Sequence, residues 1–241
     1  MSTRHQHTTS QDTAVDGQHG RLFVRTWSPE VPSHLAPIVL LHDSLGSVEL
    51  WRGFPSALCK ATGRQVVAYD RLGFGKSDPH PGTLALDFIA REAEGDFAAV
   101  IRQLGIARFI VFGHSVGGGM AVNCAAHHGA ACVALITESA QAFVEDRTVE
   151  GLEDARALFK DPGQVDRLKR YHGDKARWVL DAWIESWLAP AFATWSLRPV
   201  LPQVDCPALV IHGVDDEYGS PVHPALIAEL SGGPARLELM A

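Results

Sequence analysis

A serine set between glycines offers the clearest chemistry in this chain. Residues 113–117 have the pattern Gly-x-Ser-x-Gly, with Ser115 at the centre. This pattern is typical of a nucleophile elbow, a sharp strand-to-helix turn that leaves the serine hydroxyl exposed. The apolar run 109–112 predicts the strand and residues 120–126 predict the helix, whereas a plain glycine-rich turn is the alternative. We therefore interpret Ser115 as a nucleophile that could attack a carbonyl carbon.

A serine that attacks a carbonyl needs backbone N–H groups to stabilise the oxyanion. One N–H would come from Val116, because it is the residue after the nucleophile. The start of the predicted helix follows, where amides lack helical partners and the dipole is positive. The other would come from the loop 42–46, which follows the buried strand predicted at 37–41. Ser44 or Asp43 would donate this second N–H.

The base that takes the serine proton needs a carboxylate to orient it. The strand predicted at 208–211 runs into an acidic segment that contains Asp215, Asp216 and Glu217. A carboxylate at the carboxyl end of a strand near the serine strand could accept an imidazole N–H, whereas a solvated acidic loop is the alternative. Glu138, at the end of the preceding predicted strand, is the rival position. We favour Asp216 as the acid.

Strands and helices alternate along most of the chain. This alternation predicts an α/β fold with a mostly parallel central sheet that is covered by helices on both faces. Strands are predicted at residues 21–27, 37–41, 65–69, 108–112, 131–136, 208–211 and 235–240, and helices at 49–61, 84–104, 120–126 and 221–230.

Residues 139–204 interrupt this alternation. The segment is helix-rich and breaks at residues 161–163, which read Asp-Pro-Gly. We expect it to form a helical lid inserted before the penultimate strand, over the strand ends where ligands bind in open α/β sheets. Its apolar residues recur at helical spacing, which favours packing against the main domain. The more specific alternative is that its aromatic residues form a wall over an apolar substrate. It contains four of the six tryptophans: Trp178, Trp183, Trp187 and Trp195.

Length and charge narrow the classes of protein. The 241 residues fit one large domain, which we place at 21–241 after a polar tail, residues 1–20, that we expect to be disordered. The 21 basic and 28 acidic residues argue against a nucleic-acid or anionic-membrane partner. Because the N-terminus is polar and no long apolar stretch occurs, we expect a cytoplasmic protein that does not enter a membrane.

Cysteine spacing and the motifs suggest no bound metal or cofactor. The four cysteines are widely spaced and lack a C-x-x-C pair, so buried free thiols are favoured over a metal site or a disulfide framework. The expected partner is a small-molecule substrate, and the oligomeric state is left open.

Four motifs in order give the chain a resemblance to the α/β-hydrolase superfamily from about Arg21 to its end. This resemblance implies that Ser115 is the nucleophile and Asp216 the triad acid. It also implies that Ser44 and Val116 are the oxyanion donors, and that the reaction uses no cofactor. The motifs lie at residues 42–46, 69–78, 113–117 and 212–216.

The chain departs from the family pattern at two places. The family usually has a glycine where Asp43 stands. Its catalytic histidine follows the last strand, predicted here at 235–240, and the sequence ends at Ala241 without one. The other histidines are not expected to replace this base. His127, His128 and His172 are expected at the surface. The remaining ones are expected beside the site, in the core or at a helix start: His42, His114, His212 and His223.

The leading hypothesis is a hydrolase that cleaves a carboxylic ester, a lactone or a related acyl bond of a small apolar substrate through an acyl-enzyme on Ser115. We expect this form to be impaired, because the base is missing. In the superfamily, the same serine, acid and oxyanion donors also serve hydrolysis of a carbon–carbon bond and cofactor-free peroxidation. Dehalogenase and epoxide hydrolase activities are not expected, because those relatives have aspartate in place of the elbow serine. The alternative class is a non-catalytic small-molecule-binding homologue. A natural protein that continues past Ala241 would instead restore an ordinary hydrolase.

Overall fold

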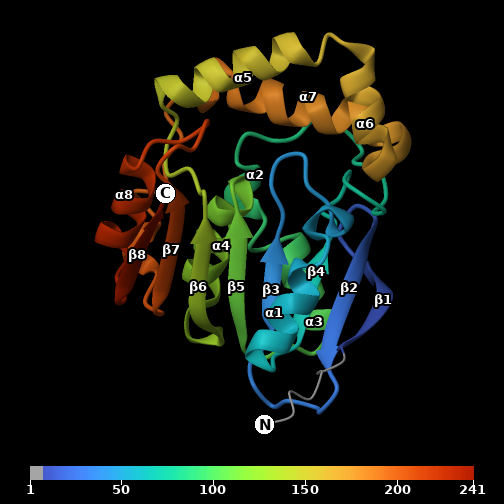
Figure 1. The fold of residues 1–241 in the computed structure, drawn as a ribbon, viewed down its shortest axis with the longest axis vertical. Helices are drawn as coiled ribbons and strands as arrows, with labels where there is room; N and C mark the ends of the chain where they lie inside the picture. Colours follow the sequence, from blue (N-terminus) through green and yellow to red (C-terminus); the bar gives the residue numbers. More distant parts are fainter. Residues whose placement is uncertain (1–7) are drawn as a thin grey trace.

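A single sheet of eight strands runs through the computed structural model, which describes residues 8–241 (Figure 1). The first two strands are antiparallel to their neighbours, and the other six are parallel to one another. From one edge to the other, the strands are β1 (Thr8–Asp16), β2 (Arg21–Pro29), β4 (Val66–Tyr69), β3 (Ile38–Leu41), β5 (Phe109–His114), β6 (Cys132–Glu138), β7 (Ala208–Gly213) and β8 (Ala235–Met240).

Helices bury both faces of this sheet. On one face, α1 (Phe54–Thr62) packs on the smaller apolar cluster, which contains Cys59 and side chains of β3 and β4. On the other face, the larger cluster is built by α2 (Phe88–Arg91), α3 (Asp96–Gln103), α4 (Val116–His128) and α8 (Val222–Leu230). Every residue of β3 and β4 is buried, which explains their uninterrupted apolar sequences. The predicted α/β fold with a mostly parallel, doubly covered sheet is confirmed.

The expectation of a disordered tail over residues 1–20 is wrong for Thr8–Asp16, and residues 1–7 lie outside the described part of the chain. β1 pairs with β2 along its whole length, from Thr8 opposite Pro29 to Asp16 opposite Arg21. A tight turn joins the two strands, with the Gly17 N–H donating to the Gly20 carbonyl over 2.9 Å. Most β1 side chains are exposed, so the strand is held by backbone hydrogen bonds, which polar residues make as well as apolar ones.

Two predicted helices are shorter than expected. The segment 84–104 forms α2 and α3, which are separated by a turn that ends at Gly95, the residue before α3. The segment 49–61 begins as a short 3-10 turn, and its α-helix starts only at Phe54, with Pro55 in the first turn. Glycine and proline near a helix end favour such interruptions, which apolar periodicity alone does not reveal.

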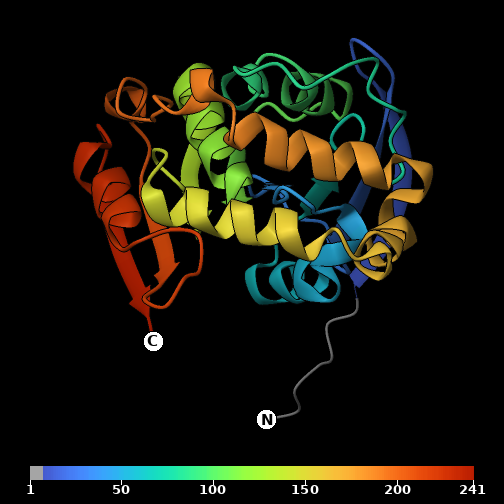
Figure 2. The ribbon, with the colours of Figure 1, turned by 90° about the horizontal axis from the view of Figure 1, so that it is seen from above.

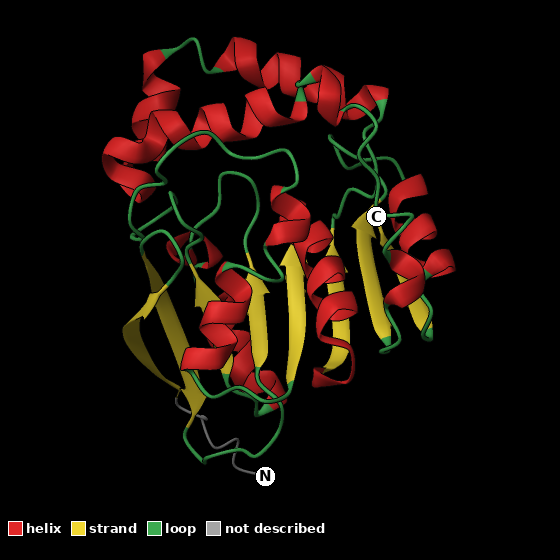
Figure 3. Ribbon diagram, turned by 180° about the vertical axis from the view of Figure 1, so that it is seen from behind, coloured by secondary structure: helices red, strands yellow, loops and turns green. Residues whose placement is uncertain are grey.

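The helix-rich segment between β6 and β7 forms α5 (Asp146–Leu158), α6 (Pro162–His172) and α7 (Ala176–Trp187). These three helices form a layer beyond the carboxyl ends of the parallel strands, and α5 and α7 run side by side across it (Figures 1 and 2). The view from behind shows the same layer separated from the helices that flank the sheet (Figure 3). The loops after β3, β5, β6 and β7 therefore face this helical layer.

A buried carboxyl group beneath these loops gives the fold a pH-dependent stability. Glu92 is 8% exposed and accepts a hydrogen bond from the Tyr69 hydroxyl. Burial, and then the nearby charge of Asp96, raise the pKa of Glu92 to about 7, from an ordinary value of 4.5. The folded state therefore holds this proton more tightly than the unfolded chain does. Its contribution to stability is complete below the ordinary pKa and is lost as the pH rises through about 7.

We expect Glu92→Gln to remove this pH dependence, because glutamine can still accept from Tyr69 but does not titrate. Between about pH 5 and about pH 8, the free energy of unfolding of the wild type should fall by up to about 3 kcal/mol more than that of the variant. Urea unfolding at both pH values measures this difference. The exposed Glu94→Gln is the matched control, and equal slopes for wild type and Glu92→Gln would contradict the argument.

Candidate active site

Ser115 lies in a strained turn between β5 and α4. Its backbone has φ 55° and ψ −124°, a conformation that residues with a side chain rarely adopt. The turn is fixed on both sides, because the Ser115 N–H donates to the Glu138 carbonyl over 2.9 Å and the Gly118 N–H donates to the Ser115 carbonyl over 2.8 Å. Such strain persists only where the surrounding structure imposes it, and it is common at functional sites.

The flanking glycines are required by close backbone contacts. A Cβ atom on Gly113 would lie 1.9 Å from the carbonyl oxygen of Gly117. A Cβ atom on Gly117 would lie 2.2 Å from the carbonyl oxygen of Leu41, at the end of β3. The sharp turn that the Gly-x-Ser-x-Gly pattern predicts therefore has a steric requirement, because no side chain fits at either glycine.

The loop 42–46 after β3 is shaped by the side chain of Asp43. Its Oδ1 accepts the Leu45 N–H over 2.8 Å, and its carbonyl accepts the Gly46 N–H over 3.2 Å. Such a side-chain-to-backbone turn gives aspartate a way to replace the glycine that the family usually has here. Ser44 and Val116, the first residue of α4, both line a small cavity of about 10 Å³. The structure thus brings the two predicted oxyanion donors together beside the elbow.

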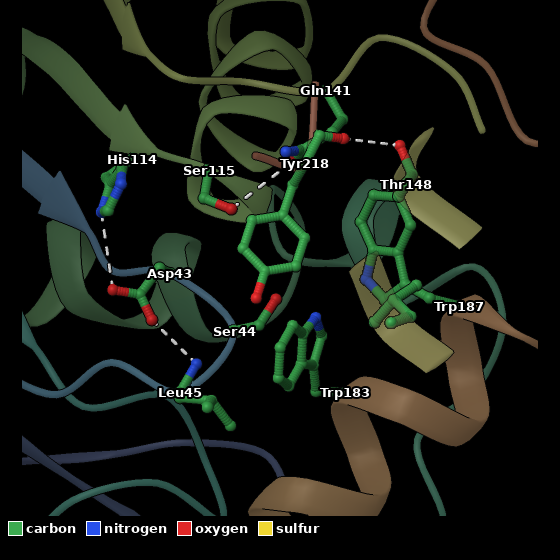
Figure 4. A pocket seen from close by; sticks show the side chains of 11 residues that line it. Asp43, Ser44, Leu45, His114, Ser115, Gln141, Thr148, Trp183, Trp187 and Tyr218 are labelled. Atoms are coloured by element: carbon green, nitrogen blue, oxygen red, sulfur yellow. Dashed lines mark hydrogen bonds and ion pairs between the residues drawn. The ribbon is translucent and has the colours of Figure 1, made fainter. Parts of the chain in front are cut away.

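A larger cavity of about 240 Å³ opens in front of the Ser115 side chain (Figure 4). Its floor comes from the elbow and the 42–46 loop, and its roof from α5 and α7. Apolar and aromatic side chains dominate the walls. The lining residues are Asp43, Ser44, Leu45, His114, Ser115, Gln141, Thr148, Leu152, Trp183, Trp187 and Tyr218.

The four tryptophans of the helical segment divide between the two roles that the sequence suggested. Trp183 and Trp187 line the large cavity as an aromatic wall. Trp178 instead stacks on His80 and donates its indole N–H to a backbone carbonyl, and Trp195 packs on the rings of Phe192 and Trp187.

His114 lies between two carboxylates at the edge of the cavity. Its Nδ1 is 3.5 Å from Asp43 Oδ2, and its Nε2 is 3.3 Å from Glu138 Oε2. Burial by itself would lower the pKa of His114, but the contact with Asp43 and the charges of Asp43, Glu138 and Asp216 outweigh it and raise the pKa above 6.5. For Asp43 the effects have the opposite sign. Burial by itself would raise the pKa of Asp43, but the hydrogen bond and the charge of His114 outweigh burial and lower this pKa. Glu138, the rival acid, thus contacts this imidazole at the elbow.

Ser115 and Asp216 lie at the same edge of the sheet but are not joined by an imidazole. The Ser115 hydroxyl donates to Gln141 Oε1 over 3.4 Å, and within residues 8–241 no histidine is hydrogen-bonded to it. The Asp216 carboxylate accepts the N–H groups of Tyr218 and Gly219, each over 2.9 Å, and so shapes the loop after β7. Its role as a triad acid stays a prediction.

Other histidines have structural partners, and one was misjudged from the sequence. The buried His212 contacts the Gly219 carbonyl, and His223 contacts Glu145 Oε1. His172 was expected at the surface, but it is 2% exposed. The expectation failed because its burial depends on contacts between α6 and loops distant in the sequence, which the local polar sequence does not reveal.

Several cavity residues were not found by sequence reasoning. Gln141, Thr148, Leu152 and Tyr218 belong to no motif. Gln141 reaches the cavity from the loop after β6, and the other three reach it because α5 and the loop after β7 fold over the elbow. One signal was present, since Gln141 follows the strand next to the serine strand at its carboxyl end, where ligands bind in α/β sheets.

The chain belongs to the alpha/beta hydrolase fold family, whose model matches residues 36–177. It is similar to the non-heme haloperoxidase of Rhodococcus erythropolis, with 26% identity over 234 residues that cover 85% of this chain and 81% of that protein. It is also 34% identical to the sn-1-specific diacylglycerol lipase ABHD11 of Danio rerio over 89 residues, which cover 37% of this chain and 26% of the lipase. This chain therefore spans only about a quarter of the lipase's length.

A solved structure shows the same fold. The 2-hydroxy-6-oxo-6-phenylhexa-2,4-dienoate hydrolase from Rhodococcus sp. strain RHA1 has a TM-score of 0.80, 16% identity, and alignment over 97% of this chain and 91% of its own. At this identity the likeness concerns the fold alone. Within residues 8–241, no helix combines the length and the apolar character needed to cross a bilayer.

His172 joins the helical layer to the floor of the cavity. Its Nδ1 accepts the Gly75 N–H over 2.9 Å, and its Nε2 therefore carries the proton that it donates to the Leu45 carbonyl over 3.0 Å. Burial lowers the pKa of His172, which keeps the ring neutral in this arrangement. Protonation of Nδ1 would place an N–H against the Gly75 N–H, so the stability from this contact is lost as the pH falls below the ordinary value of 6.5.

We expect His172→Ala to lower the free energy of unfolding by about 2 kcal/mol or more at neutral pH, because two buried backbone groups lose their partner. The exposed His127→Ala is the matched control and should change stability little. Urea unfolding measures both variants. The difference in the free energy of unfolding between wild type and His172→Ala should become smaller as the pH falls below about 6. A difference that stays the same would contradict a neutral His172 with its proton on Nε2.

Proposed function

We propose that this chain is a serine hydrolase that cleaves a carboxylic ester, a lactone or a related acyl bond of a small apolar substrate. The observation that carries the proposal is the strained Ser115, whose hydroxyl opens into the cavity of about 240 Å³. Trp183, Trp187 and Leu152 make the cavity walls apolar, and its volume fits a small acyl group or a single ring.

In the proposed reaction, the Ser115 oxygen attacks the substrate carbonyl carbon and its proton passes to the leaving alkoxide. The backbone N–H groups of Ser44 and Val116 stabilise the oxyanion, and the alcohol leaves an acyl-enzyme on Ser115. Water then attacks the acyl carbon, which releases the carboxylic acid and returns the proton to the serine oxygen. Asp216 is proposed as the triad acid, the group that would orient an imidazole base beside Ser115.

Proton transfer is the weak step of this scheme in the chain as it stands. The Ser115 hydroxyl contacts the amide oxygen of Gln141, which is not a base at neutral pH. Among residues 8–241 no imidazole is hydrogen-bonded to the Ser115 hydroxyl, so we propose that water accepts the serine proton. Loss of one member of a triad costs several orders of magnitude in rate. We therefore propose slow acylation, with the elbow and oxyanion donors supplying the remaining rate.

Two other functions have specific support. The haloperoxidase relative, which aligns over most of both chains, favours cofactor-free oxidation at the same elbow as an alternative reaction. The contact between Ser115 and Gln141 favours a non-catalytic protein that binds a small apolar molecule in the cavity. The acylation experiment that follows distinguishes the binding protein from acyl transfer.

We expect short-chain p-nitrophenyl esters to leave an acyl group on Ser115, detectable by intact-mass and peptide-mass measurement. Ser115→Ala should abolish both the adduct and the hydrolysis above background, whereas Ser10→Ala, on the exposed β1, should change neither. Turnover of the wild type should lie about a thousandfold below ordinary enzyme rates of about 1–1000 per second. If wild type and Ser115→Ala bind an apolar ester equally and neither forms an adduct, the hydrolase proposal is wrong and the non-catalytic binding protein is favoured.

We expect the rate of acylation to fall as the pH rises through the raised pKa of His114. The positive imidazolium compensates the charges of Asp43 and Glu138 beside the place where the oxyanion forms. Its loss leaves two uncompensated carboxylates there and destabilises the transition state. The measurement is the pH profile of acylation after subtraction of the Ser115→Ala rate. His114→Gln should flatten the profile and His127→Ala should not. A rate that rises through this range in the wild type but not in His114→Gln would mean that His114 acts as the base.

A further inference from the structure

Two cysteine thiols meet at the end of the sheet opposite to the elbow. Cys132 is the first residue of β6, and Cys206 lies just before β7 begins at Ala208. Their sulfur atoms are 3.8 Å apart. Cys59 in α1 and Cys124 in α4 are buried elsewhere, and all four thiols are free in this structure.

The backbone around this pair can accommodate a covalent bond. β6 and β7 are parallel neighbours in the sheet, with Leu135 opposite Ala208. Neighbouring strands lie about 4.8 Å apart, which is within the range of Cα separations that disulfides span. The sulfur atoms need to approach each other by less than about 2 Å, which small side-chain rotations can supply.

The two thiols differ in accessibility and acidity. Cys132 is 3% exposed, whereas Cys206 is partly exposed and reachable by a small oxidant. The hydrogen bond between them lowers the pKa of Cys206 and raises that of Cys132. Cys206 is thus suited to be the attacking thiolate, and Cys132 to be the thiol that resolves the oxidised product.

We propose that Cys132 and Cys206 are a modification site that forms a reversible intramolecular disulfide on exposure to a hydroperoxide. The Cys206 thiolate attacks a peroxide oxygen, which breaks the O–O bond, gives a sulfenic acid and, from hydrogen peroxide, releases water after protonation. The Cys132 sulfur then attacks the sulfenic sulfur, loses its proton and displaces the hydroxyl group as a second water. Two thiols are oxidised to one disulfide, and one peroxide is reduced to two waters.

The bridge would close the chain around the whole helical layer. Residues 133–205 contain α5, α6 and α7, so the disulfide joins the two ends of the segment that roofs the cavity. A bond that closes so long a loop restricts the unfolded chain strongly and should stabilise the fold. Ser115 lies beyond the opposite ends of the strands, so the cavity and any reaction in it should be unaffected. The inference does not depend on the proposed hydrolase reaction.

The test treats the purified chain with hydrogen peroxide, blocks the remaining thiols and measures intact and peptide masses without reduction. We expect the loss of two hydrogen atoms and a cross-linked pair of peptides that contain Cys132 and Cys206. The thermal midpoint should rise by about 5 °C or more, and dithiothreitol should return it to its first value.

Matched variants make the outcome decisive. Cys206→Ser replaces a partly exposed side chain and should abolish the cross-link, as should Cys132→Ser, whereas Cys59→Ser should retain it. Addition of oxygen atoms to Cys206 without cross-linking would overturn the proposal. A bridge between two molecules, or one that involves Cys59 or Cys124, would also overturn it.

Discussion

The close contact between the end of β5 and the start of α4 is the constraint on which the site depends. Two glycines let the backbone fold back on itself so tightly that no Cβ atom fits, and the Ser115 backbone takes a conformation that its own side chain disfavours. The neighbouring strand holds this turn through the hydrogen bond from Ser115 to the Glu138 carbonyl. The parallel sheet thus supplies both the strand that delivers the serine and the strand that fixes its angle.

Charge at the elbow follows from the same geometry. The turn places the His114 side chain between the loop after β3 and the end of β6, where Asp43 and Glu138 contact its two ring nitrogens. Asp43 also shapes the 42–46 loop, so its carboxylate cannot leave without loss of that turn. An anionic group beside the proposed oxyanion donors, Ser44 and Val116, is unfavourable unless a positive charge compensates it. The histidine before the serine therefore makes the aspartate tolerable in a position where the family usually has glycine.

The fold and the elbow could be predicted from the sequence because their signals are local. Apolar runs identify buried parallel strands, and the glycine pattern identifies the turn around Ser115. β1 was missed because its polar residues are held by pairing with β2, which periodicity does not reveal. His172 was missed because α6 buries it against loops almost a hundred residues away in sequence. The role of Asp216 stays a prediction. Its position at the sheet edge follows from the strand before it, and the hydrogen bonds of its carboxylate lie within its own loop.

The size of the cavity depends on how the helical layer is attached at its two ends. Near α7, Lys175 donates to the carbonyls of Gly75 and Ser77, beside the contacts of His172. Before α5, Glu145 accepts from the backbone and hydroxyl of Ser220 in the loop after β7. These attachments are polar, and His172 adds a contact to the Leu45 carbonyl in the 42–46 loop, which forms part of the cavity floor. The roof and the floor are thus joined by directional hydrogen bonds rather than by apolar contact alone. Because the packed helical layer also forms the roof of the cavity, a shift of either attachment would alter the space above Ser115.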